Sequence, residues 1–324
     1  MNHTIRYLTR ADVETLSISM DEVIQRKEDA FREKGAGASH MPPKHWIAPD
    51  EHRFFSAMSG ALPGFGAAAC KWQSGSDQNH EHGLPYITGL LILNELDSGL
   101  PVAIMDSTWI TAMRTAAATG VTSRYLASRG PRTVGIIGCG VQGRTNLAAL
   151  MRVHDTIRSV NVYDIERDAA DHFIREMEEL HGLEVKRLDY PHDVIARGDI
   201  VVTGGPIVPG GDRCIAADWL QPGSLLVTLD YDCYLADGVL HEVEAVFTDD
   251  LGQLQHLAEF GFFCNAPDHI AEIGSVIVGA NAGRSQQSDR IIAVNMGIAL
   301  EDVAIATLVH ERAMQRDAGC LLSL

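Results

Sequence analysis

A short apolar run leads directly into a glycine-rich turn near the middle of the chain. Residues 133–143 read Thr-Val-Gly-Ile-Ile-Gly-Cys-Gly-Val-Gln-Gly, so Gly138, Gly140 and Gly143 stand at G-x-G-x-x-G spacing. In this pattern the first glycine permits a tight turn, the second lets a pyrophosphate approach the backbone, and the third lets the helix pack on the strand. Amide groups at the start of such a helix favour phosphate. The stretch predicts a dinucleotide site, and the alternative is a glycine-rich turn in an ordinary α/β domain.

The segments that flank the turn follow the order of a nucleotide-binding unit. We expect a strand at 134–137, a helix at 144–153 and a second strand at 159–163. Asp164 ends the second strand, roughly twenty residues past the last glycine, where an acid accepts hydrogen bonds from ribose hydroxyls and repels a 2′-phosphate. The sequence therefore predicts NAD as the cofactor and favours NADH over NADPH.

Composition limits the possible partners and compartments. The 324 residues suffice for two domains, and 46% hydrophobic with 21% charged residues is typical of a globular protein. A net charge of −17 argues against nucleic acid and anionic membranes as partners. The six cysteines lack C-x-x-C spacing, and we find neither an apolar signal segment nor a run long enough to span a membrane. We therefore expect a cytoplasmic protein with reduced thiols.

Strand and helix patterns alternate along the chain, which predicts an α/β fold with a Rossmann-type parallel sheet. A long amphipathic pattern at 295–314 predicts a terminal helix that returns to the N-terminal part. We therefore expect the parallel-sheet domain, residues 113–299, to be inserted in a discontinuous α+β domain, residues 1–112 plus 300–324. Further expected strands lie within 54–72 and 84–105 and at 200–203, 224–228 and 245–248, and further expected helices lie at 20–33, 108–128, 168–180 and 192–197.

Three residues are candidates for substrate binding or catalysis because of their positions in the sequence. Lys71 lies in an apolar run, 68–72, so it is either an exposed edge residue or a cation that points into a cleft. Arg114, which we expect to open a helix, either clamps a carboxylate or phosphate or is a solvated surface residue. Asp230 follows a strand at the edge where open α/β sheets bind ligands, and Asp232 competes with it for an acid–base role. His80, Glu81 and His82 are too few to predict a metal site, so we expect none.

Several blocks of the chain form a recognisable set, namely Met41-Pro42-Pro43-Lys44, Lys71-Trp72, 83–85, 110–117, 135–143, 272–274, 283–284 and 297–302. Together they resemble the ornithine cyclodeaminase/mu-crystallin family, and the resemblance covers nearly the whole length. It implies a homodimer whose outer domain carries the substrate contacts and the dimer interface. The family includes ornithine and lysine cyclodeaminases, archaeal-type alanine dehydrogenase and imino-acid reductases, and mu-crystallin also binds a hormone.

Residue roles follow from the resemblance, position by position. Lys71 and Arg114 would hold the substrate carboxylate, with Lys71 also polarising the reacting centre, and Asp230 would be the acid–base carboxylate. Asp164 would bind the adenosine ribose. The other implied cofactor contacts are Arg114, Thr115, Gly138, Gly140, Val141, Gln142, Gly143 and Thr203.

Two positions depart from the family pattern. Lys44 stands where the family commonly has an arginine, so this candidate substrate contact supplies charge but no planar fork. Asp230 is followed by Tyr231 and Asp232 instead of the Pro-Gly-Lys segment of cyclodeaminases, which weakens the case for ornithine cyclisation.

The leading hypothesis is therefore an NAD(H)-dependent reductase or dehydrogenase of a small 2-imino or 2-amino acid. One alternative is a cyclodeaminase of ornithine or a related diamino acid with retained NAD. The other is a non-catalytic protein of the mu-crystallin kind that binds NAD(P)H and a small ligand.

Overall fold

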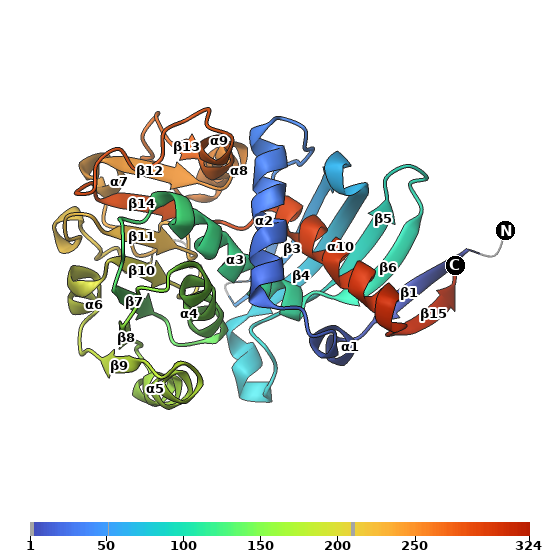
Figure 1. The fold of residues 1–324 in the computed structure, drawn as a ribbon, viewed down its shortest axis with the longest axis horizontal. Coiled ribbons are helices and arrows are strands. Elements are labelled where there is room, and N and C mark those ends of the chain that lie inside the picture. The colour runs from blue at the N-terminus through green and yellow to red at the C-terminus, as the bar shows by residue number, and fades with distance from the viewer. Residues whose placement is uncertain (1–2, 51, 209–210) are drawn as a thin grey trace. The chain divides into compact units, whose positions relative to one another are not determined.

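The computed structural model describes residues 3–50, 52–208 and 211–324. The chain forms two compact units, one made of Met1–Arg114 with Ile298–Leu324 and the other of Thr115–Gly297. Each unit is built around its own sheet, labelled in Figure 1. The first division falls inside helix α3 (Thr108–Leu126), and the second falls just before helix α10 (Ala299–Arg316).

The unit Thr115–Gly297 holds an eight-stranded sheet in which every pair of neighbouring strands is parallel. Its order is β13-β12-β14-β11-β10-β7-β8-β9. The order reverses at β7, which pairs with β8 on one side and β10 on the other, and such a switch point is where doubly wound sheets bind ligands. The strands are β7 Thr133–Ile137, β8 Ser159–Tyr163, β9 Glu184–Arg187, β10 Ile200–Thr203, β11 Leu225–Thr228, β12 Ala245–Thr248, β13 Ala271–Glu272 and β14 Ile291–Val294.

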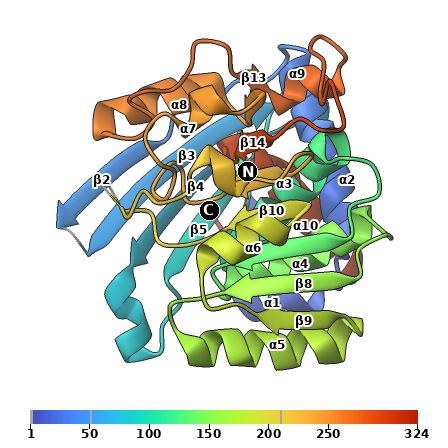
Figure 2. The ribbon, with the colours of Figure 1, turned by 90° about the vertical axis from the view of Figure 1, so that its left-hand side faces the viewer.

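Helices cover both faces of this sheet. A Cβ at Gly135 of β7 would lie 2.8 Å from Val194 of helix α6, whereas the next residue, Ile136, meets Gly143 of helix α4. Because successive strand residues point to opposite faces, α4 and α6 lie on opposite sides of β7, and α5 packs beside β9 (Figure 2). The helices of this unit are α4 Val141–Val153, α5 Arg167–His181, α6 Pro191–Arg197, α7 Val239–Glu242, α8 Leu251–Leu257 and α9 Ile273–Ile277, with 3-10 turns at Ala217–Trp219 and Ala258–Phe260.

The other unit holds a seven-stranded mixed sheet of order β15-β1-β6-β5-β4-β3-β2. Only the β1–β6 pair is parallel among its described strands. The first and last strands of the chain are neighbours in this sheet. The elements are β1 Thr4–Leu8, α1 Arg10–Thr15, α2 Met20–Gly35, β2 His45–Asp50, β3 Arg53–Leu62, β4 Ala67–Ser76, β5 Ile87–Glu95, β6 Pro101–Asp106 and β15 Cys320–Ser323, with 3-10 turns at Pro63–Phe65 and Asp77–His82.

Helices α2 and α10 lie side by side (Figure 1), and α10 packs across β3 and β4. Strand alternation decides which residues of the mixed sheet are buried. Met58, Lys71 and Leu91 occupy paired positions on β3, β4 and β5, and all three are buried. Their neighbours Trp72 and Leu90 are each 48% exposed on the opposite face. Lys71 thus belongs to the buried face of this sheet.

The structure confirms the predicted α/β fold with a parallel-sheet unit inserted in a discontinuous α+β unit. It confirms the start of the helix expected at 108–128, which ends at Leu126, but corrects the prediction that Arg114 opens a helix. Helix α3 begins at Thr108, whose amide donates to Asp106 Oδ1 at 2.9 Å, so Arg114 lies in its interior. The terminal helix begins at Ala299 rather than 295, because Gly297 adopts φ +77°, which ends the preceding extended segment.

Candidate active site

The glycine turn has a different physical requirement at each of its three glycines. Gly138 has φ +98°, and a Cβ there would lie 2.7 Å from the Gly204 carbonyl oxygen. A Cβ at Gly143 would lie 2.4 Å from the Gly138 carbonyl oxygen. At Gly140, by contrast, an added Cβ would meet no atom within 4 Å. Folding therefore requires glycine at 138 and 143, whereas glycine at 140 leaves open space at the start of α4.

A cavity of about 520 Å³ lies beside this turn, at the carboxyl ends of β7, β8 and β10. Gly140 is the N-cap of α4 and has no side chain with which to cap the first amides. Those amides and the positive end of the helix dipole suit a phosphate group. The glycine spacing and the open space at Gly140 thus fit a dinucleotide. The cavity is lined by Ile137, Gly138, Gly140, Tyr163, Asp164, Ile165, Glu166, Pro191, Thr203, Gly204, Gly205, Pro206, Asp212, Cys214, Ile215 and Tyr234.

Asp164 lies in the wall of this cavity and also braces the turn. Its Oδ2 accepts a hydrogen bond from the Cys139 amide at 2.7 Å, and its Oδ1 accepts from the Glu166 amide at 2.9 Å. Each carboxylate oxygen has a second lone pair, which is available to a ribose hydroxyl.

Three further residues predicted to contact the cofactor, Val141, Gln142 and Thr115, lie on helices. Val141, the first residue of α4, is exposed. Gln142 follows it and accepts from Asn146 Nδ2 at 3.2 Å. Thr115 is partly buried on α3, directly after Arg114, where the two units divide.

Asp230 lies directly behind the cavity wall. The Thr203 hydroxyl donates to Asp230 Oδ1 at 2.7 Å, and the Gly205 amide donates to Oδ2 at 2.9 Å. The side chain is buried, and burial raises its pKa to about 6, although both hydrogen bonds act to lower it. The structure therefore brings together two of the predicted residues, Asp230 and Thr203, and Asp230 changes its charge close to neutral pH.

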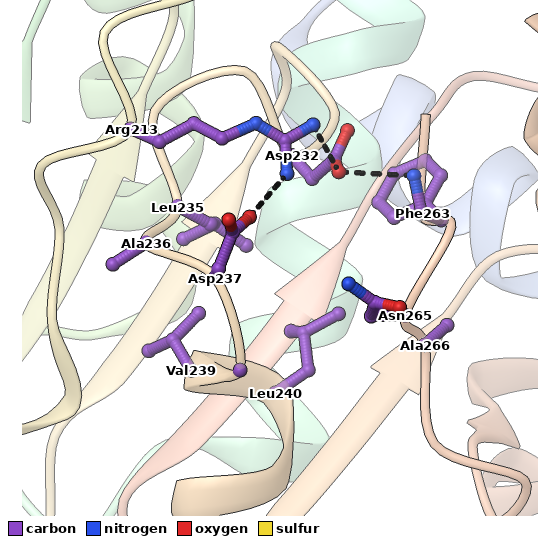
Figure 3. Close-up of a pocket in the computed structure, with 11 residues that line it drawn as sticks. Arg213, Asp232, Leu235, Ala236, Asp237, Val239, Leu240, Phe263, Asn265 and Ala266 are labelled. Carbon is purple, nitrogen blue, oxygen red and sulfur yellow. Dashed lines mark hydrogen bonds and ion pairs between the residues drawn. The ribbon is translucent and has the colours of Figure 1, made fainter. Parts of the chain in front are cut away.

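Asp232, the competing carboxylate, has different partners (Figure 3). Its Oδ2 lies 3.1 Å from Arg213 Nη2 and accepts from the Phe263 amide at 2.9 Å. Arg213 also contacts Asp237 at 2.9 Å. These groups line a separate small pocket of about 20 Å³, so Asp232 joins two loops rather than facing the glycine turn.

In the other unit, Lys71 and Arg114 meet in a buried ionic cluster. Lys71 Nζ lies 2.8 Å from Asp302 Oδ1 and donates to the Thr111 hydroxyl at 3.3 Å. Arg114 Nη1 lies 2.7 Å from Glu301 Oε2, and its Nε lies 3.4 Å from Asp302 Oδ1. We use the term buried ionic cluster for the three cations and two carboxylates Lys27, Lys71, Arg114, Glu301 and Asp302, in which Lys27 pairs with Glu301.

Within this cluster, burial and the neighbouring charges have opposite effects on the pKa values of Lys71 and Glu301. Burial lowers the pKa of Lys71 to about 8, and the nearby Asp302 carboxylate acts to raise it. Burial also acts to raise the pKa of Glu301, but Lys27 and Arg114 hold it below its ordinary value. Lys71 is therefore mainly an ammonium at neutral pH, yet it loses its proton more readily than a solvated lysine.

Sequence reasoning missed three members of the cluster, each of which left a signal. Lys27 falls between the apolar pairs Val23–Ile24 and Ala30–Phe31 on one face of α2, so the 3.6-residue period places it inward. Glu301 and Asp302 are adjacent acids within an apolar stretch of α10. Lys44, the remaining predicted substrate contact, is buried just before β2.

Within the described ranges 3–50, 52–208 and 211–324, no group of three or more His, Cys, Asp or Glu residues is placed to hold a metal ion. Within the same ranges, none of the helices combines the length and apolarity that a bilayer crossing requires.

A doubly wound parallel sheet with this glycine turn defines a Rossmann-type α/β protein. More specifically, the chain belongs to the ornithine cyclodeaminase/mu-crystallin family, whose model matches residues 4–317. It is 34% identical over 320 residues to an alanine dehydrogenase of Archaeoglobus fulgidus, with 96% of each chain covered.

Two solved structures have the same fold over nearly their whole length. One is the Δ1-pyrroline-2-carboxylate reductase of Thermococcus litoralis in complex with NADH and L-proline, at 30% identity and a TM-score of 0.87, covering 98% of this chain and 99% of that one. The other is an archaeal alanine dehydrogenase dimer with bound NAD, at 31% identity and a TM-score of 0.87, covering 99% of both chains.

Proposed function

We propose that this chain is an NAD(H)-dependent reductase or dehydrogenase that interconverts a small 2-imino acid and the matching 2-amino acid. The observation that carries the proposal is the buried pairing of Lys71 and Arg114 in one cluster, on a chain that also has the open glycine turn. The reductase that is 30% identical and binds NADH and L-proline supports both halves of the proposal.

The cofactor half rests on the cavity of the parallel-sheet unit. Backbone amides at Gly140, Val141, Gln142 and Gly143 would hold the pyrophosphate beside Gly138, whose own amide donates to the Tyr163 carbonyl at 2.9 Å. Asp164 would accept from the adenosine ribose. Thr203, Arg114 and Thr115 are the further proposed cofactor contacts. Bound NADH supplies the hydride that reduces the imine carbon.

NADH is the proposed form of the cofactor. Asp164 and Glu166 both line the cavity, and two carboxylates beside the ribose would repel a 2′-phosphate. Arg167, the nearest following cation, is exposed and lies 3.9 Å from Asp189.

The substrate half rests on the buried ionic cluster. Cations outnumber carboxylates three to two in this cluster, so a substrate carboxylate adds the negative charge that balances the charges of its five residues. We propose that Lys71 and Arg114 bind this carboxylate. Lys44, which is not a member of the cluster, is the third proposed substrate contact. Holding the substrate in one orientation removes much of the entropic barrier to hydride transfer.

Proton transfer completes the proposed reaction. Reduction of C=N adds hydride to C2 and a proton to nitrogen, and oxidation of the amine reverses both. We propose that Asp230 contacts the nitrogen and manages this proton, because its pKa of about 6 lies near neutral pH. Lys71, with a pKa of about 8, would polarise the C2 centre.

We further propose a homodimer that forms through the exposed face of the mixed sheet. Trp72 pairs with Leu90 and Cys70 with Ile92 across β4 and β5, and all four side chains are exposed. Contiguous apolar surface of this kind marks an association site, and the archaeal alanine dehydrogenase is a dimer.

We also propose that the protein works in the cytoplasm. All six cysteines are free, which supports a reducing compartment of this kind.

The test is NADH oxidation by the purified chain with pyruvate plus ammonia, glyoxylate plus ammonia, and Δ1-pyrroline-2-carboxylate. Loss of absorbance at the NADH band with at least one of these imines is the expected result. Ammonia release from ornithine without net change in NADH would identify a cyclodeaminase instead. Binding of NADH without turnover of any substrate would identify a binding protein, and either result rejects the proposal.

A further inference from the structure

We propose that Asp302 is a positioning residue that holds the Lys71 ammonium beside the Arg114 guanidinium and keeps Lys71 protonated. One oxygen carries both contacts, since Asp302 Oδ1 lies 2.8 Å from Lys71 Nζ and 3.4 Å from Arg114 Nε. A single carboxylate oxygen therefore sets the spacing of two cations that come from a strand and a helix. The role in catalysis rests on the proposed function, but the electrostatic role does not.

The surroundings of Lys71 explain why a carboxylate is needed there. Its cross-strand neighbours, Met58 on β3 and Leu91 on β5, are apolar and buried. Without an opposite charge, such an environment favours the neutral amine. Helix α3 contributes the Thr111 hydroxyl and the Arg114 guanidinium, which is itself a cation.

Helix α10 supplies the compensating charge. Asp302 contacts both Lys71 and Arg114, whereas Glu301, one position earlier, contacts Arg114 and Lys27 of α2. Of the two adjacent acids, Asp302 is therefore the one that contacts Lys71. Asp302 is placed to set the protonation of Lys71, and Glu301 is placed to hold Arg114. This division provides a matched pair of variants.

Thermal unfolding measured from about pH 6.5 to pH 9.5 tests the electrostatic role without any substrate. Asp302→Asn keeps the size of the side chain but removes its charge, so the folded-state pKa of Lys71 falls further below its unfolded value. The loss of stability relative to wild type is then largest below the lowered pKa of Lys71 in the variant and shrinks as the pH rises to about 8. It is constant above that pH, where Lys71 is neutral in both folded proteins.

Lys71→Met supplies the control background. There the effect of Asp302→Asn should no longer vary with pH, because the titrating partner is gone. A difference between Asp302→Asn and wild type that is constant over the same pH range would overturn the proposal, since Asp302 would then act through packing or hydrogen bonding alone.

The second readout is the pH profile of kcat/KM, in which we expect activity to fall at alkaline pH as Lys71 loses its proton (the alkaline limb). Asp302→Asn should move the alkaline limb to lower pH by about one unit, the usual effect of losing a neighbouring opposite charge. Glu301→Gln, which removes a charge that does not touch Lys71, should move it less. Equal shifts in the two variants contradict the division of roles. An inactive wild type overturns the proposed function, and the unfolding series then decides the role of Asp302 by itself.

Discussion

Lys71 and Asp302 are separated by 231 positions in the sequence, yet Lys71 Nζ lies 2.8 Å from Asp302 Oδ1. The lysine comes from the middle of strand β4 and the aspartate from the first turn of the last helix. Both side chains are buried, so each needs the other as a counter-charge. The C-terminal helix is therefore part of the candidate substrate site rather than a terminal addition to the fold.

Replacing Lys71 with methionine should reduce turnover of the imino acid at least about a hundredfold, because the substrate loses a carboxylate contact and the reacting centre loses a neighbouring cation. NADH affinity should change little, since Lys71 is not among the residues proposed to contact the cofactor. Steady-state kinetics and calorimetric titration with NADH measure the two effects. Lys186→Met, at an exposed lysine of β9, is the control and should retain full activity. Wild-type turnover in the Lys71 variant would refute the site.

Two glycine-to-alanine variants should separate folding from cofactor binding. Gly143→Ala drives a methyl group to 2.4 Å from a backbone oxygen and should destabilise the protein by about 1–3 kcal/mol, as overpacking does. Gly140→Ala meets no protein atom within 4 Å, so its unfolding midpoint should remain near wild type. Its NADH affinity should nevertheless fall at least about tenfold, because the methyl group occupies space beside the pyrophosphate. Unchanged NADH binding by a folded Gly140→Ala protein would show that the cofactor does not pass this residue.

Unlike the edge strand β9, which was not predicted, most strands of the parallel sheet could be predicted from the sequence because they are buried on both faces. Such strands appear as short, continuous apolar runs, and the runs at 159–163, 200–203 and 245–248 coincide with β8, β10 and β12. The edge strand β15, by contrast, is exposed at every residue, so no apolar alternation marks it. Its place beside β1 depends on pairing between the two ends of the chain, which local patterns do not encode.

The candidate site could be predicted only in part. Lys71 and Asp230 stand out because each is a charged residue in or directly after an apolar strand. Their partners depend on contacts between distant segments, and neither Asp302 nor Thr203 has a local signal that assigns it to a particular partner. Arg114 illustrates the same limit. Its sequence position predicts the start of a helix, whereas it lies in the interior of α3. Its burial against Glu301 depends on the terminal helix, which local sequence patterns do not place beside it.

Asp164→Asn should weaken NADH binding and improve NADPH binding. The neutral amide loses the charge that strengthens hydrogen bonds from ribose hydroxyls, and it no longer repels a 2′-phosphate. We expect the ratio of the two dissociation constants to shift by about tenfold toward NADPH, since one charge-assisted hydrogen bond contributes about 1.5 kcal/mol. Asp168→Asn in the first turn of α5 is the control and should leave this ratio unchanged. An unaltered ratio in Asp164→Asn would remove Asp164 from the ribose site.

Trp72→Glu combined with Leu90→Glu should convert the proposed dimer into a monomer. The two residues face one another across β4 and β5, and Phe55 stacks on Trp72 at a centroid distance of 5.9 Å. Charges placed here oppose burial of this face against a second copy. Sedimentation or light scattering should report half the mass of wild type, while glutamate at the exposed Tyr190 of the other unit should have no effect. A wild-type protein that is monomeric at micromolar concentration would contradict the proposed interface.

The pH dependence of amino-acid oxidation should reveal Asp230. Its pKa is raised to about 6 by burial, so the carboxylate that receives the proton from nitrogen is ionised above this pH and is lost as the pH falls through it. The profile of kcat/KM should therefore have an acid limb near pH 6. Asp230→Asn should abolish the limb and lower turnover at all pH values.

Thr203→Val provides a finer test of the same carboxylate. The Thr203 hydroxyl donates to Asp230 Oδ1 and stabilises its ionised form, so removing the hydroxyl raises the pKa of Asp230 further. The acid limb should consequently move to higher pH. Thr228→Val is a matched control, because Thr228 occupies the paired position on β11, is equally buried, and makes no described hydrogen bond with Asp230. If both valine variants shift the limb by the same amount, or if neither shifts it, the group that titrates near pH 6 is not Asp230.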